Sequence, residues 1–128
     1  MSVTVSNVAN PLGTLLVTDT EANGTAEENA TGATGIIYSV QIDNTLNTAG
    51  VYVKIADNAM AGTTSQDQAP HYVYYAPAGE TVTYACPGGS AYATALSFWC
   101  TTVKASFHGV NETQTDPLSN VNVKILTT

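Results

Sequence analysis

The sequence contains no arginine and only three lysines, against ten aspartates and glutamates, so its formal charge at pH 7 is -7. Proteins that bind nucleic acid or anionic lipid need clusters of basic side chains, and phosphate groups are commonly clamped by arginine. We therefore expect no nucleic-acid partner, no membrane partner and no phosphoryl-transfer activity. Charged residues make up only 10% of the chain, so its polar surface must come largely from 20 threonines, 10 asparagines and 8 serines.

Long apolar runs are also lacking. No segment approaches the roughly 18 apolar residues of a membrane-spanning helix. The first residues, Met-Ser-Val-Thr-Val-Ser-Asn, have neither the basic stretch nor the apolar run of a secretory signal. We therefore expect synthesis in the cytoplasm and no insertion into a membrane.

Short segments in which apolar and polar residues alternate recur along the chain, as half-buried β-strands require. The clearest is 36–42, where one predicted core-facing row consists of Ile36, Tyr38, Val40 and Ile42. In a second segment, 51–56, one face of the predicted strand carries Val51, Val53 and Ile55, and the other face carries Tyr52, Lys54 and Ala56. The loop between these two segments is rich in Asn, Thr and Gly, which predicts that they form an antiparallel hairpin.

Six further strands are predicted at 3–5, 14–17, 71–75, 81–85, 97–103 and 121–126. Helical periodicity is not sustained anywhere, and β-branched and aromatic residues dominate the apolar set. With 128 residues, the chain has the usual length of one domain. The predicted fold is therefore all-β: a single antiparallel β-sandwich or jelly roll of about eight short strands.

The segment 18–35 differs in composition from the rest of the chain, because it has no large apolar side chain and carries Asp19, Glu21, Glu27 and Glu28. Such a composition predicts a solvated loop or a flexible acidic arm. The alternative is an arm that a neighbouring subunit orders. We thus divide the single domain into residues 1–35, a strand pair with a Thr/Asn/Gly-rich arm or loop, and residues 36–128, the sandwich core.

Two cysteines, Cys86 and Cys100, are spaced suitably for a disulfide. Synthesis in a reducing compartment favours free, buried thiols instead. A cysteine nucleophile activated by His71 or His108 is the sharpest catalytic hypothesis, but neither cysteine lies in a recognisable nucleophile motif. We therefore predict that the chain is not an enzyme.

Metal sites have little support in the sequence. The cysteines and histidines lack zinc-finger spacing, and no loop follows the twelve-residue calcium pattern. Asp57, Asn58 and Asp67 offer oxygen ligands for calcium, yet Asp and Asn are ordinary turn residues. We predict no metal and no cofactor.

Aromatic residues are concentrated, since seven of the ten lie between positions 72 and 99. In a strand, Tyr72 and Tyr74 share one face and Tyr75 lies on the other, so at least one tyrosine is predicted to be exposed. Tyr and Trp are enriched at protein interfaces. The candidate interface residues are Tyr72, Tyr74, Tyr75, Tyr92 and Trp99. The alternatives are a sugar-stacking platform and burial in the core.

Several short motifs occur in order between roughly residues 36 and 104: Ile42-Asp43-Asn44-Thr45, Gly62-Thr63-Thr64, Pro77-Ala78-Gly79, Pro87-Gly88-Gly89 and Leu96-Ser97-Phe98-Trp99-Cys100. This pattern resembles that of small β-domains in tailed-bacteriophage virions. The chain departs from the pattern at two places: Ser65-Gln66-Asp67 follows Gly-Thr-Thr where Pro-Asp is frequent, and Ala95 precedes Leu-Ser where Gly is common.

The resemblance implies a structural protein, either a capsid cement or decoration protein on the outer shell or a protein of the tail or neck. It brings no catalytic residues. The expected partners are the major capsid protein and copies of the chain itself, with a trimer as one candidate homo-oligomer. The expected location is the outer capsid surface, after synthesis in the host cytoplasm. The alternative from another class is a carbohydrate- or receptor-binding β-sandwich that uses Tyr74, Tyr75 or Trp99 for stacking.

Overall fold

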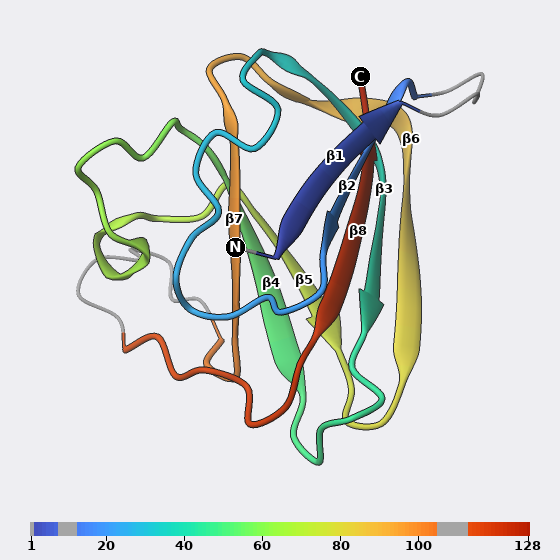
Figure 1. The fold of residues 1–128 in the computed structure, drawn as a ribbon, viewed down its shortest axis with the longest axis vertical. Helices are drawn as coiled ribbons and strands as arrows, with labels where there is room; N and C mark the ends of the chain where they lie inside the picture. Colours follow the sequence, from blue (N-terminus) through green and yellow to red (C-terminus); the bar gives the residue numbers. More distant parts are fainter. Residues whose placement is uncertain (1, 8–12, 105–112) are drawn as a thin grey trace.

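The alternating segments form strands in the computed structural model, which describes residues 2–7, 13–104 and 113–128. The strands are β1 (Val3–Asn7), β2 (Leu15–Asp19), β3 (Gly35–Asp43), β4 (Val51–Asp57), β5 (Tyr72–Ala76), β6 (Thr81–Tyr92), β7 (Leu96–Thr101) and β8 (Asn122–Thr127). A single 3-10 turn, η1 (Ser65–Asp67), lies between β4 and β5. The strands make two antiparallel sheets that face each other (Figure 1), so the predicted all-β fold is confirmed.

The first sheet has the strand order β1-β2-β8-β3-β6, and the second has the order β5-β4-β7. Residues 23–30 run along the free edge of β7, where Glu27 and Phe98 form a bridge. The neighbouring segments of the second layer therefore lie in the order 23–30, β7, β4 and β5. Without β1, each layer contains four segments. The order in which successive segments of the chain are placed in the two layers is that of a jelly roll.

The acidic segment 18–35 is therefore not a free arm, and this corrects the sequence-based prediction. The backbone N–H of Glu27 donates to the carbonyl of Phe98 at 2.8 Å, and the N–H of Phe98 donates back at 3.1 Å. The N–H of Cys100 donates to the carbonyl of Asn23 at 2.8 Å. These bonds pair backbone N–H and carbonyl groups on the otherwise open edge of β7. The backbone requires such pairing, but the side-chain composition of the segment does not reveal it.

The predicted hairpin between β3 and β4 is also wrong, because the two strands belong to different sheets. β3 is paired on both sides, by β6 and β8, which leaves no edge for β4. The loop after β3 instead turns a corner around the buried side chain of Asn44. Its amide donates to the carbonyls of Ala49 (2.9 Å), Ala76 (3.3 Å) and Pro77 (3.1 Å), and its oxygen accepts from Asn47 at 2.9 Å.

The alternation predicted for β3 holds only in its second half. The register of β3 against both of its neighbours shifts between Ile37 and Ser39. Ile37 is therefore buried together with Val40 and Ile42. The two residues that were predicted to share their face, Ile36 and Tyr38, are only half-buried. A bulge of this kind moves side chains to the other face of a strand without any change in composition.

The partner strand β6 has its own irregularity opposite this shift. Gly88 and Gly89 have φ angles of 80° and 81°, in the left-handed region that favours glycine. A Cβ atom on Gly89 would overlap the side chain of Ile36, whereas the same atom on Gly88 would meet nothing within 4 Å. The Pro-Gly-Gly motif is thus part of a long, bulged edge strand.

The main core lies between the sheets and is built from buried Val, Ile and Phe side chains, principally Val17, Ile37, Val40, Ile42, Val51, Val53, Ile55, Phe98, Val123 and Ile125. A second, smaller cluster, of Ala56, Met60 and Trp99, lies on the outer side of β4 and β7. Lys54 is on the same side, and it is buried although the alternation in β4 turns it away from the main core. Its Nζ donates to the side-chain oxygen of Gln114 at 3.3 Å.

Candidate functional site

Two of the five candidate interface residues are interior. Tyr92 and Trp99 are each 1% exposed. The hydroxyl of Tyr92 shares a 2.6 Å hydrogen bond with the Thr127 hydroxyl, and the indole N–H of Trp99 donates to Gln114. Their rings are used within the chain, so neither belongs to its accessible surface. This also removes Trp99 as a stacking platform.

Tyr72 and Tyr74 lie on the inner side of β5, where this edge strand faces the edge strand β6. The hydroxyl of Tyr72 donates to the carbonyl of Ala91 at 3.1 Å. The ring of Tyr74 packs against that of Tyr84, with centroids 5.2 Å apart, and its hydroxyl is 3.5 Å from Cys86 Sγ. Burial raises the pKa of Tyr74 above its ordinary value. These half-buried rings close one side of the sandwich.

Tyr75 is the candidate that the structure leaves accessible, on the outer face of the second sheet. Its ring lies 4.9 Å from that of Tyr52, its cross-strand partner on β4. Tyr75 and Val73 are both 42% exposed. Gly50 makes room for this arrangement, since a Cβ atom there would strike the Tyr75 ring. We call Tyr52, Val73 and Tyr75 the tyrosine patch.

Tyr52 and Val73 were not among the residues singled out from the sequence. Val73 shares the face of Tyr75 because it lies two residues earlier on the same strand. The contact of Tyr52 with Tyr75 depends instead on the register between β4 and β5, which pairs these two residues. A sequence shows which side of a strand a residue occupies, but it does not show which residue lies opposite on the neighbouring strand. The alternation within 51–56 was the available signal for Tyr52.

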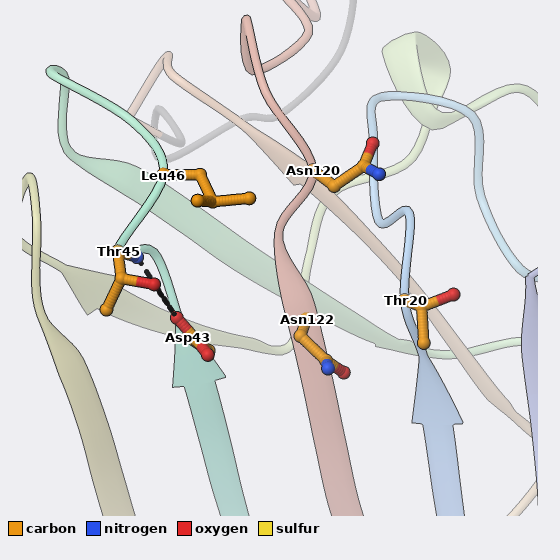
Figure 2. Close-up of a pocket in the computed structure, with 6 residues that line it drawn as sticks. All are labelled: Thr20, Asp43, Thr45, Leu46, Asn120 and Asn122. Atoms are coloured by element: carbon orange, nitrogen blue, oxygen red, sulfur yellow. Dashed lines mark hydrogen bonds between the residues drawn. The ribbon is translucent and has the colours of Figure 1, made fainter.

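A second surface feature is a cavity of about 380 Å³ where β2 and β3 end and β8 begins (Figure 2). We call it the polar pocket, and its lining residues are Thr20, Asp43, Thr45, Leu46, Asn120 and Asn122. Asp43 accepts hydrogen bonds from the Thr45 hydroxyl at 2.6 Å and from the Thr45 N–H at 3.1 Å. These bonds hold the pKa of Asp43 below its ordinary value. Sequence reasoning missed this pocket because three separate strand ends form it.

Asp57, Asn58 and Asp67, the weighed calcium ligands, use oxygens in bonds to the chain itself. Asp57 accepts the N–H groups of Ala93, Thr94 and Ala95 at 2.8, 2.7 and 3.2 Å, and so caps the turn between β6 and β7. Asn58 accepts from the Met60 N–H, and Asp67 accepts from the Thr64 hydroxyl. Within residues 2–7, 13–104 and 113–128, no three His, Cys, Asp or Glu side chains are grouped to hold a metal.

Both cysteines are free thiols, as predicted. Cys100 is buried, whereas Cys86 is only half-buried. Burial raises the pKa of the Cys100 thiol to about 12. His71 accepts a 3.0 Å hydrogen bond from the backbone N–H of Asp57. His108, the other partner considered for a cysteine nucleophile, lies outside the described residues.

In the described part of the chain, no helix has the length and apolar character needed to cross a membrane. Comparison with known proteins finds no matching family model, no similar curated protein and no similar solved structure.

Proposed function

We propose that this chain is a structural protein of a tailed-bacteriophage virion, which binds the outer surface of the capsid and stabilises the junctions between its subunits. Its partners would be the major capsid protein and further copies of the chain. The proposal includes no catalytic activity. The motifs between residues 36 and 104 suggest the virion context, and the observation that carries the binding role is the tyrosine patch.

The tyrosine patch has the properties of a preformed contact surface. The rings of Tyr52 and Tyr75 are already in contact at 4.9 Å, on adjacent strands of one sheet. Tyrosine offers a large amphipathic area and loses little conformational entropy on binding. Val73 adds an exposed apolar side chain beside the rings. A partner that covers this patch would bury apolar and aromatic surface without reordering the domain.

Charge supports an outer rather than a luminal position. The formal charge is -7, and one of the three lysines, Lys54, is buried and so contributes little to the surface. A negatively charged surface is repelled by packaged DNA. A protein on the outer shell escapes this repulsion.

A position on the tail or neck is the alternative within the virion, and it would use the same patch. Three residues were considered for sugar stacking in a carbohydrate-binding module. Tyr74 is half-buried and Trp99 is buried, so of the three Tyr75 is the one whose ring remains accessible for stacking.

The test is binding of the purified chain to capsid shells that lack it. We expect the wild type to co-sediment with shells, and Tyr75→Ser to bind at least about tenfold more weakly, as for an interface hot spot. Val5→Ser is the matched control, because Val5 is also 42% exposed but lies on β1 in the other sheet. Failure of the wild type to bind would contradict the capsid proposal. Equal binding by Tyr75→Ser would contradict the role of the tyrosine patch.

A further inference from the structure

The two sheets have four edge strands, and three of these edges are covered by other described parts of the chain. Segment 23–30 bonds to the edge of β7. The edge strands β5 and β6 face each other, and tyrosine hydroxyls donate to backbone carbonyls between them, from Tyr84 to Tyr75 and from Tyr72 to Ala91. The molecule thus closes its sheets against itself wherever a second layer is at hand.

The fourth edge, β1, has no such cover within the described part of the chain, and its one partner there is β2 (Figure 1). The register with β2 is unbroken from Val3 to Asn7, so no bulge bends the strand away. Residues 4–7 are exposed on both faces of the strand. Edge strands are usually protected from pairing by a bulge, a proline or a charged side chain. The strand Val-Thr-Val-Ser-Asn has none of these and is open to a further strand.

The hydrogen-bond pattern shows which backbone groups of β1 face outward. The N–H of Thr20 donates to the carbonyl of Ser2 at 3.5 Å. Bonded and non-bonded residue pairs alternate along an antiparallel ladder. Every second residue from Ser2 onward therefore bonds to β2, and the N–H and carbonyl groups of Val3, Val5 and Asn7 point to the open edge.

A second copy of β1 matches these groups in number and direction. Antiparallel pairing about a two-fold axis at Val5 places Val5 opposite Val5 and Val3 opposite Asn7. Each of the three outward residues would then exchange backbone hydrogen bonds with its partner, about six bonds in all. The two Val5 side chains, each 42% exposed in the single chain, would lie side by side on one face. Such a contact is the same on both copies and closes at a dimer.

The distribution of charge favours a second copy as the occupant of this edge. Copies of a chain with a formal charge of -7 repel each other, so they can approach most easily where charge is absent. Residues 1–18 contain no charged side chain, and the first one, Asp19, is buried. An uncharged edge has nothing that selects a basic or acidic partner, whereas a second β1 fits it in length, register and valine content.

We propose that β1 joins two copies of the chain in a two-fold dimer, in which the five-stranded sheets continue into each other across paired β1 strands. The proposed function includes contacts between copies of the chain, and this inference assigns a surface to them. It does not rely on binding to a capsid.

The first test is the oligomeric state of the full chain in solution. Sedimentation velocity from about 1 µM to about 1 mM should show a monomer–dimer equilibrium. In NMR spectra over the same range, the amides of Val3, Val5 and Asn7 should shift with concentration, and those of Tyr52 and Tyr75 should not. A chain that stays monomeric throughout would overturn the proposal. So would a trimer, or a dimer whose shifts fall on the tyrosine patch instead of β1.

Variants then test the register. Val5→Lys and Val5→Glu each place like charges directly opposite each other, so each should weaken dimerisation at least about tenfold. An equimolar mixture of the two should restore it, because opposite charges then meet. Val73→Lys is the matched control, since Val73 is also 42% exposed but lies on β5 in the other sheet. Val5→Ser should still dimerise, because it adds no charge and keeps the backbone groups.

Unchanged dimerisation of both charged Val5 variants, or no recovery in their mixture, would contradict pairing through β1. Loss of the dimer in Val73→Lys would contradict it as well. Shell binding is measured separately. A wild-type dimer that fails to bind shells would contradict the capsid proposal alone, and a wild-type monomer that binds shells would contradict the β1 dimer alone.

Discussion

The indole N–H of Trp99 donates a hydrogen bond of 2.9 Å to the side-chain oxygen of Gln114. The same oxygen accepts from the buried ammonium group of Lys54 at 3.3 Å. One glutamine, 15 residues beyond the tryptophan, thus holds the segment before β8 over the outer side of β4 and β7. This explains how the sheet buries a lysine on the side that faces away from the main core.

Gln114→Ala should lower the free energy of unfolding by about 1–3 kcal/mol, because it removes an acceptor shared by two buried donors. Urea denaturation followed by Trp99 fluorescence measures the change. Gln66→Ala is the control, since Gln66 is exposed on η1. Equal stability of the two variants would show that the Gln114 oxygen has no stabilising role.

Gly88 and Gly89 provide a second, internally controlled test. Both have positive φ, so alanine at either position costs about 1 kcal/mol of backbone strain. Only at Gly89 does the new Cβ also overlap Ile36. Gly89→Ala should therefore destabilise the protein by about 1–3 kcal/mol more than Gly88→Ala, as overpacking does elsewhere. Thermal melts of the two variants decide this, and equal Tm values would contradict the described bulge.

The two thiols should differ in reactivity. Cys100 is buried and its pKa is raised to about 12, so it should resist iodoacetamide in the folded protein, whereas the half-buried Cys86 should be labelled. Mass spectrometry of the labelled protein measures this, and unfolding in urea should make both thiols reactive. Labelling of Cys100 in the folded state, at the rate of Cys86, would contradict its burial.

The same burial has a consequence at alkaline pH. The unfolded thiol of Cys100 ionises near its ordinary pKa of about 8.5, while the folded thiol keeps its proton up to about pH 12. Its contribution to stability is therefore full below pH 8.5 and falls by up to about 1.4 kcal/mol per pH unit above it. The stability of Cys100→Ala should fall less steeply with pH over this range. An unchanged slope of stability against pH would argue against the raised pKa of Cys100.

Glu27 should destabilise the folded protein when it is ionised. Burial and the nearby carboxylate of Asp19 raise the pKa of Glu27 in the folded protein. The protonated side chain therefore stabilises the folded state below the unfolded pKa of about 4.3. This contribution is lost as the pH rises through the folded pKa. Glu27→Gln should raise stability at pH 7 by at most about 1 kcal/mol, since water reaches the group, and change little near pH 3.5. Thermal melts at both pH values measure this. Glu21→Gln, at an exposed position, removes the same charge, and an equal gain there would contradict the role of Asp19 and burial.

The strands of this fold were predictable from the sequence, but the paths between them were not. Alternating residues mark the position of all eight strands, because one face of a half-buried strand must be apolar. The end of β6 was not predicted, since this strand continues to Tyr92, well beyond the predicted end at residue 85. The corner at Asn44 was mistaken for a hairpin turn, since an asparagine that binds three carbonyls inside the fold has the same identity as one in a surface turn. The role of residues 23–30 depends on backbone hydrogen bonds, which the sequence does not show.

The candidate site was predictable to a similar extent. The alternation in 71–75 correctly separated Tyr75 from Tyr72 and Tyr74, because side chains alternate in direction along a strand. Trp99 was wrongly predicted to be an accessible interface residue. Its side chain points outward from β7, but the segment that contains Gln114 covers it. The polar pocket joins Thr20, Asp43 and Asn122, which come together only once the order of β2, β8 and β3 is known.

The most direct test of the proposed function is quantitative mass spectrometry of purified virions from a culture that produces this chain. A capsid decoration protein should be present at a fixed simple ratio to the major capsid protein, such as one-to-one or one-to-three. That ratio is the result we predict. A few copies per particle would contradict the capsid position and favour the tail or neck, and absence of the chain from the particles would contradict the virion proposal altogether.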